Sequence, residues 1–195
     1  MIRQEGSLRP SYRKSVIRRI FGNEMDQEIR DIIIKHGSNI LCSDTFKETF
    51  DQTHHYKTTV GDHILGVTVE AIKVCLRHNQ TDDQTLGNVV TSCLCHDLGI
   101  VGRDEKYNNN FETLIWHPKH SAEVYKELTG EEDERVLDAI HSHMFPLKPP
   151  MPKHREGWIL TWADKISASM DILQIPPVTV EEREELLELA EQEQE

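Results

Sequence analysis

Residues 83–99 read DQTLGNVVTSCLCHDLG. They have the hydrophobic spacing of an amphipathic helix and include the polar pair His96-Asp97. Apolar side chains recur there at steps of three and four residues: Leu86, Val89, Val90, Cys93 and Leu94. The same spacing continues into His96 and Asp97. The stretch therefore predicts a helix over 83–97 that brings an imidazole and a carboxylate into the protein interior.

The rest of the chain is also predicted to be helical. Few windows alternate with the period of a strand, and no Asn-Gly or Asp-Gly hairpin signal occurs. We expect loops at 99–116 and 145–155, with Pro118 in a first helical turn. The predicted helices are 11–20, 25–36, 44–52, 58–78, 83–97, 118–129, 132–144, 156–173 and 179–192. Together they predict an all-α fold, a single-domain multi-helix bundle.

Composition divides the chain into three segments. Residues 1–42 are predicted to form an N-terminal helical extension that begins with a basic arm, and residues 43–175 the main helical domain. The pair Pro176-Pro177 is expected to end this domain before an acidic C-terminal helix within residues 176–195. That last helix could pack on its own domain or on a second copy of the chain, so formation of a homo-oligomer stays open.

The overall composition argues against several classes of protein. The chain has 195 residues, of which 37% are hydrophobic, and a formal net charge of −12. No apolar run approaches the roughly 20 residues that cross a bilayer, and no signal peptide is recognised. The negative charge argues against a nucleic-acid-binding protein. The four cysteines are scattered, so we expect them to be reduced thiols rather than disulfides. We therefore expect a cytoplasmic protein that binds neither membranes nor nucleic acid.

Several histidines and a second carboxylate are predicted to face the interior. The residues that fall on apolar helix faces, or at their ends, are His63, His96, Asp97, His117, His143 and Asp164. An ionised carboxylate inside a helical core is costly unless a cation or several donors compensate its charge. A shared divalent metal would compensate it, and imidazole with carboxylate suits Fe, Mn, Co, Ni or Zn. Separately hydrogen-bonded core histidines are the alternative.

Three short motifs in sequence order carry a family resemblance. They are His63, then Cys95-His96-Asp97-Leu98-Gly99, then Ala163-Asp164-Lys165. Over roughly residues 54–170 they resemble the H…HD…D pattern of the HD-domain metal-dependent phosphohydrolases. The resemblance implies an all-helical bundle with the metal at its centre. Carried over residue by residue, it implies that the ligands of the first metal are His63, His96, Asp97 and Asp164.

Members of this family that hold two metals add further histidines. One commonly stands in a His-Pro pair and another near the end of the next helix. His117-Pro118 and His143 match these places. The resemblance therefore implies one or two divalent ions, with Asp97 as the bridge when two are bound.

Other histidines and two cysteines lie near these motifs. His55 is similar to a histidine in some relatives that ligates metal or faces substrate; an ordinary loop histidine is the alternative. His120 and His141 are predicted to lie beside the ligands. Cys93 and Cys95 are predicted to be packed residues of a helix. They are not expected to bind zinc, because a zinc-thiolate site would need a second cysteine pair.

The chain departs from the family pattern at two places. Many relatives carry a lysine three residues after the aspartate of the His-Asp pair. In this chain the pair is His96-Asp97, and Ile100 stands at that place. Arg103 or Lys165 could supply the missing positive charge. The Gly-Tyr-Pro signature of cyclic-dinucleotide phosphodiesterases is absent after His143, which argues against that specific activity.

The leading interpretation is a metal-dependent phosphohydrolase, a phosphomonoesterase or phosphodiesterase, that acts on a nucleotide or small phosphorylated metabolite through a metal-activated water. Asp97, Lys165 and Arg103 are the predicted catalytic residues. His55, Lys57 and Arg103 are predicted to contact the substrate. Two alternatives stay open, namely a di-iron oxygenase of the same fold and a non-catalytic nucleotide-binding regulator.

Overall fold

The structure is a computed structural model that describes residues 25–53, 58–175 and 177–194. In this part of the chain the regular elements are all helices, so the predicted all-α bundle is confirmed. The elements are α2 (Gln27–Leu41), α3 (Asp44–Lys47), η1 (Glu48–Phe50), α4 (Val60–Arg77), α5 (Asp83–Cys95), η2 (Leu98–Ile100), α6 (Arg103–Lys106), α7 (Asn110–Thr129), α8 (Glu134–Ser142), α9 (Arg155–Ile172) and α10 (Val180–Glu193). The predicted helix 11–20 lies outside the described residues.

Side-chain caps set where most of these helices begin. A Ser, Thr, Asp or Asn just before the helix accepts a hydrogen bond from an early backbone N–H, which has no partner within the helix. The capping residues are Asp26, Ser43, Thr59, Asp82, Asn109, Asp133 and Thr179. The capped helices α4, α5, α8 and α10 begin and end within two residues of the predicted bounds, and so does α9, which has no side-chain cap.

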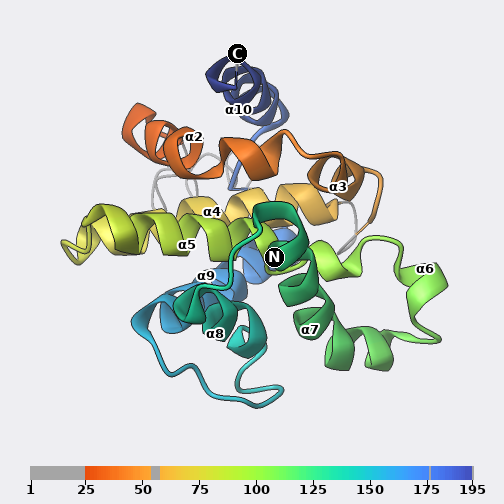
Figure 1. The fold of residues 1–195 in the computed structure, drawn as a ribbon. Coiled ribbons are helices and arrows are strands. Elements are labelled where there is room, and N and C mark those ends of the chain that lie inside the picture. The colour runs from red at the N-terminus through yellow and green to blue at the C-terminus, as the bar shows by residue number, and fades with distance from the viewer. Residues whose placement is uncertain (1–24, 54–57, 176, 195) are drawn as a thin grey trace, which may run out of the picture.

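The helices stack in layers around α4 and α5. Figure 1 shows α10 and α2 on one side of these two helices, and α7, α8 and α9 on the other. Helix α4 packs against both α9 and α5, while α5 also contacts α2, α7 and α8. Elements far apart in sequence therefore meet at the two central helices.

Two clusters of buried apolar residues hold these layers together. The larger cluster joins α2, α4, α5, α7 and α8, and α10 contributes Leu186 and Ala190 to it. The smaller cluster lies among α4, α5, α8 and α9, with Val67, Val89 and Leu160 among its members. Helices α2 and α10 thus share a core with the central helices, and α10 packs against α2 of its own chain. The segment boundaries at residues 43 and 176 stay predictions.

Helix α7 differs from the sequence-based prediction. It begins at Asn110, within the expected loop 99–116, and Pro118 lies inside it rather than in its first turn. Asn109 caps the helix, because its side chain accepts a hydrogen bond from the Glu112 N–H at 2.9 Å. The helix continues through Pro118 although proline lacks the N–H that would bond to the Leu114 carbonyl. The short helix α6 also lies in the expected loop.

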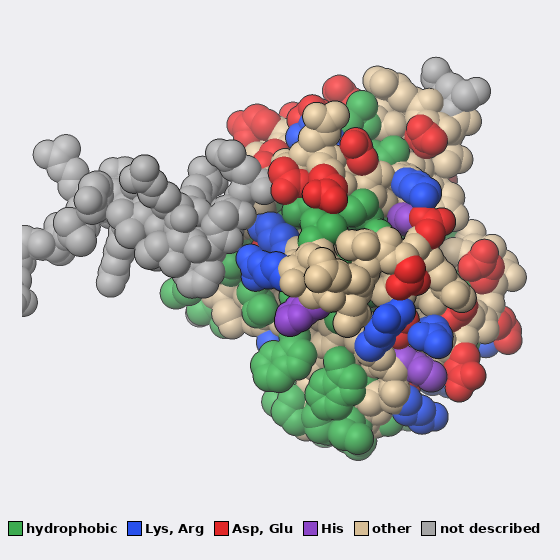
Figure 2. All heavy atoms as spheres, turned by 90° about the vertical axis from the view of Figure 1, so that its left-hand side faces the viewer, with side chains coloured by type: hydrophobic (Ala, Val, Ile, Leu, Met, Phe, Trp, Pro, Cys, Tyr) green, Lys and Arg blue, Asp and Glu red, His purple; other side chains and the backbone are tan. Residues whose placement is uncertain are grey.

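The two ends of the layered bundle have different surfaces. On the face drawn in Figure 2, acidic side chains lie near the end where α10 lies and along one side of the molecule, and hydrophobic side chains gather at the opposite end. The exposed glutamates of α10 include Glu184 and Glu188, whereas its Leu186 is fully buried. Among the described residues, no helix has both the length and the apolar character required to span a bilayer.

Candidate metal centre

The six predicted metal ligands lie together at the centre of the bundle. His63 lies in α4, His117 in α7 and Asp164 in α9. His96 and His143 are the residues at which α5 and α8 end, and Asp97 follows His96 directly. All six are buried, the most accessible being Asp164 at 8% exposure. Five helices and the turn after α5 thus supply one side chain each.

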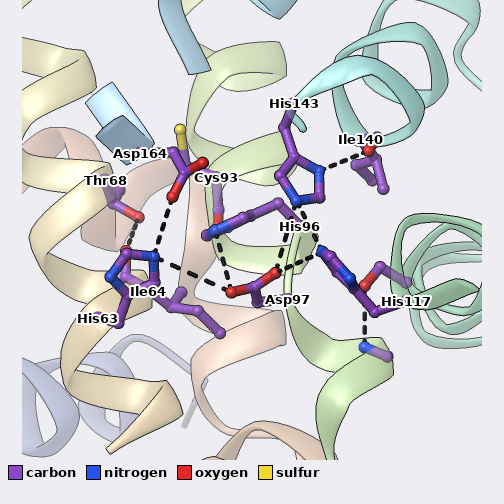
Figure 3. Close-up of polar contacts among 12 residues, drawn as sticks. His63, Ile64, Thr68, Cys93, His96, Asp97, His117, Ile140, His143 and Asp164 are labelled. Carbon is purple, nitrogen blue, oxygen red and sulfur yellow. Dashed lines mark hydrogen bonds and ion pairs between the residues drawn. The ribbon is translucent and has the colours of Figure 1, made fainter. Parts of the chain in front are cut away.

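The ligands form two groups with Asp97 between them (Figure 3). His63, His96 and Asp164 form one group and Asp97, His117 and His143 the other, with ligand atoms in each group within 4.8 Å of one another. Asp97 Oδ2 lies 3.5 Å from His96 Nε2 and 4.0 Å from His63 Nε2. Asp97 Oδ1 lies 3.3 Å from His117 Nε2 and 3.6 Å from His143 Nε2. Each carboxylate oxygen therefore faces a different pair of imidazoles.

Hydrogen bonds to backbone carbonyls fix three of the rings. His96 Nδ1 lies 2.7 Å from the Cys93 carbonyl oxygen, and His143 Nδ1 lies 2.7 Å from that of Ile140. His117 Nδ1 lies 2.8 Å from the carbonyl oxygen of Thr113. A carbonyl oxygen only accepts, so each Nδ1 carries a proton. In its neutral form each ring therefore turns an unprotonated Nε2 toward the centre.

This arrangement fits divalent cations. His117 Nε2 and His143 Nε2 lie 2.9 Å apart, so two lone pairs face each other when both rings are neutral. The buried His96 Nε2 has no hydrogen-bond partner among the described residues. Buried acceptors without a donor are costly, and a cation shared with the carboxylates would satisfy them. The donor set of imidazole and carboxylate suits a divalent transition metal.

Buried charges perturb the titration of these groups. Burial alone would lower the pKa of His63, but hydrogen bonds to Asp164 and Asp171 outweigh burial and raise the pKa to about 10. Burial would raise the pKa of Asp164, whereas the contacts with His63 and Lys165 lower it far below its usual range. Burial and the neighbouring imidazole of His117 lower the pKa of His143 to about 3. Without metal, the first group therefore holds an imidazolium and the second holds a neutral His143.

Asp171 is a residue at the site that the sequence motifs did not indicate. It is 2% exposed, and its Oδ2 accepts a hydrogen bond from His63 Nδ1 at 2.8 Å. His63 Nε2 then lies 3.2 Å from Asp164 Oδ1. Asp171 thus orients the His63 ring from behind, as carboxylates commonly do for metal-ligating histidines. The only signal in the sequence is a second aspartate seven residues after Asp164 on the same helix.

The turn that carries Asp97 is bound tightly to α7. The Gly99 N–H donates to Ser121 Oγ at 2.9 Å, and the Tyr107 hydroxyl donates to the Gly99 carbonyl at 3.0 Å. The Tyr107 oxygen lies 2.6 Å from His120 Nδ1, which places His120 behind this turn. The half-buried His141 belongs to neither ligand group.

A cleft of about 470 Å³ opens over the ligand cluster. Asp97, His117, His143 and Asp164 reach it, and Arg103 and Lys165 also line it. Lys165 Nζ donates to Asp164 Oδ2 at 2.6 Å and to the His143 carbonyl at 3.0 Å. The structure therefore brings both predicted cations to the cleft above the ligands. The predicted substrate contacts His55 and Lys57 lie outside the described residues.

The two cysteines beside His96 belong to the packed interior. Cys93 and Cys95 are fully buried and free, and burial raises the pKa of both thiols. A thiol that is difficult to ionise is a poor nucleophile and a poor metal ligand. This agrees with the structural role predicted for both.

Comparison with known proteins assigns the chain to a family. The family model described as HD domain matches residues 60–169, more than half of the chain, and this range contains all six clustered ligands. Neither the curated proteins nor the solved structures yielded a match to the chain. The chain therefore belongs to the HD domain family, a superfamily of metal-dependent hydrolases.

Proposed function

We propose that this protein is a metal-dependent phosphohydrolase that acts on a nucleotide or another small phosphorylated metabolite. The observation that carries the proposal is the placement of Asp97, whose two oxygens face two separate pairs of histidines at the floor of an open cleft. Paired divalent cations joined by a carboxylate suit hydrolysis of a phosphate ester. The cations Arg103 and Lys165, which line this cleft, suit the same substrate class.

The two ligand groups define which residues would hold the ions. His63, His96 and Asp164 would hold one divalent ion, His117 and His143 the other, and Asp97 would contact both. Such ions, when bound, lower the pKa of a coordinated water and neutralise charge on phosphoryl oxygens. The fixed Nδ1–H bonds of His96, His117 and His143 hold their rings in the required tautomer.

Lys165 is suited to hold the phosphate. Its ammonium group has three protons, and two are donated within the protein, to Asp164 and to the His143 carbonyl. The third is available to a phosphoryl oxygen, because Lys165 also lines the cleft. Lys165 could thus take over the phosphate contact that family members make with the lysine absent at Ile100.

In the proposed reaction the oxygen of water forms a bond to phosphorus as the ester P–O bond breaks. The leaving oxygen takes a proton, so a phosphomonoester gives an alcohol and inorganic phosphate. The Asp164 carboxylate keeps its charge throughout, since contacts with His63 and Lys165 outweigh burial and lower its pKa.

Removal and return of metal test the proposal. The protein is treated with a chelator, then supplied separately with Mn²⁺, Fe²⁺, Co²⁺, Ni²⁺ or Zn²⁺, and phosphate release is measured across a panel of phosphorylated metabolites. We expect release to stop in the metal-free protein and to return with at least one ion. Equal release with and without metal, or no release with any ion, would contradict the proposal.

Oxygen chemistry at two irons is a second candidate function. It is favoured by the second ligand group, which gives the centre four histidines and two aspartates. Consumption of dissolved oxygen by the iron-loaded protein with a panel compound, without phosphate release, would support this function over hydrolysis.

A further inference from the structure

The walls of the cleft change in character from the ligands outward. On α7 the lining residues Asn110, Thr113, Leu114 and His117 follow one helix face, as expected for residues separated by three, four and seven positions. A helix rises 1.5 Å per residue, so Asn110 lies about 10 Å along the axis from the ligand His117. The cleft therefore extends about two helical turns beyond the metal ligands.

An apolar zone follows directly above the ligands. Leu114 lies one turn from His117, Ala168 one turn from Asp164, and Ile100 three residues after Asp97. Met144, next to His143, completes this zone. A chemical group bound here would exchange water for apolar side chains, which favours a hydrocarbon or aromatic body over a polyhydroxylated one.

Polar groups return farther from the ligands. Asn110 lines the cleft there, and so does Arg103, the first residue of α6, which lies toward the outer side of the bundle where α7 begins (Figure 1). The described lining residues contain no carboxylate apart from the ligands Asp97 and Asp164. Asp104 lies 3.8 Å from Arg103 Nε but is 91% exposed and outside the lining, so solvent screens its effect on the guanidinium.

We propose that the substrate is a phosphate ester with an apolar body next to the phosphate and an anionic group at its far end. The phosphate would meet the ligand cluster and Lys165, the body would lie among Ile100, Leu114, Met144 and Ala168, and Arg103 would bind the distal anion. Asn110 would donate a hydrogen bond to the same group. This inference rests on the proposed phosphohydrolase function.

A matched set of synthetic esters tests the inference on the metal-loaded protein. The probes are 4-(carboxymethyl)benzyl phosphate, its uncharged carboxamide and ribose 5-phosphate, compared by kcat/KM for phosphate release. We expect the carboxylate to exceed the carboxamide about tenfold, the worth of a charge-assisted hydrogen bond in a partly solvated site. Both benzyl esters should exceed ribose 5-phosphate.

Two variants assign the preference to Arg103. Arg103→Gln should bring the carboxylate-to-carboxamide ratio close to one, and Arg103→Lys should restore part of it. Lys106→Gln removes a cation from the same short helix, but Lys106 is exposed and outside the cleft lining, so the ratio should not change.

The outcomes separate this inference from the proposed function. The inference alone would be overturned if both benzyl esters release phosphate with a carboxylate-to-carboxamide ratio near one in the unmodified protein. It would also be overturned if Arg103→Gln leaves that ratio intact. Binding of the corresponding benzylphosphonates, measured by calorimetry, should show the same preference without turnover. Absence of release from every ester with every metal would overturn the proposed function, and equal phosphonate binding would then overturn the inference as well.

Discussion

Replacement of Asp171 should weaken metal binding although Asp171 is not itself one of the clustered ligands. The buried carboxylate accepts a hydrogen bond from His63 Nδ1 at 2.8 Å and thereby holds Nε2 of the ring toward Asp164 and Asp97. Asp171→Asn keeps an oxygen that can accept this bond but removes the negative charge. Asp171→Leu removes both and frees the ring to rotate.

The size of the effect follows from this geometry. Loss of the hydrogen-bond partner of a metal-ligating histidine commonly costs 10- to 100-fold in metal affinity. Both partners are almost fully buried, so water cannot replace Asp171. We therefore expect a loss of about 100-fold, or about 2.7 kcal/mol, for Asp171→Leu. The loss for Asp171→Asn should be about tenfold, or about 1.4 kcal/mol.

Calorimetric titration of the metal-free protein with Mn²⁺ or Zn²⁺ measures these affinities. Glu156→Gln is the matched control, because Glu156 is also a buried carboxylate of α9 but accepts a hydrogen bond from Arg135 instead of a ligand. Its metal affinity should stay unchanged even if its unfolding temperature falls. Nitrogen chemical shifts of His63 should also report a mixed tautomer in Asp171→Leu. Unchanged affinity in Asp171→Leu, or an equal loss in Glu156→Gln, would show that Asp171 does not hold His63 for metal binding.

Three further perturbations probe the same centre. Asp97→Asn should lose ions from both groups, which elemental analysis of the dialysed protein can measure; full retention of metal would contradict the bridging position. Gly99→Ala should lower the free energy of unfolding in urea by about 1–3 kcal/mol. A Cβ at this position would lie 2.6 Å from the His117 carbonyl oxygen and 2.6 Å from the Ser121 nitrogen. Stability equal to the parent would count against this packing. Metal affinity should rise about tenfold per pH unit from pH 7 toward 10. The pKa of His63 is raised to about 10, so metal binding must displace the proton on its Nε2. An affinity independent of pH would exclude a protonated His63.

Much of the candidate site could be predicted because it lies on strongly periodic helices. The three- and four-residue spacing of apolar side chains in α4 places His63 on the buried face, and the same spacing in α5 leads to His96 and Asp97. Periodicity depends only on helix geometry, so neighbouring residues suffice to show which side chains face inward. The family pattern then added Asp164 to the same centre.

Other features depend on three-dimensional contacts that periodicity does not encode. Helix α9 is buried around much of its circumference, so its pattern could not distinguish Asp171 from a residue that faces elsewhere. The early start of α7 depends on the Asn109 cap, which competes with the stronger apparent start signal at Pro118. The ring tautomers depend on carbonyl groups such as that of Cys93, whose direction is set by the way the helix ends.

The proposed function places Asp97 between two metal ions. Anomalous diffraction from a crystal of the Mn²⁺-loaded protein would locate these ions. We expect two peaks per chain, one beside His63, His96 and Asp164 and one beside His117 and His143, with Asp97 in contact with both. Peaks confined to surface carboxylates, or a single peak with none beside His117 and His143, would contradict this placement of Asp97.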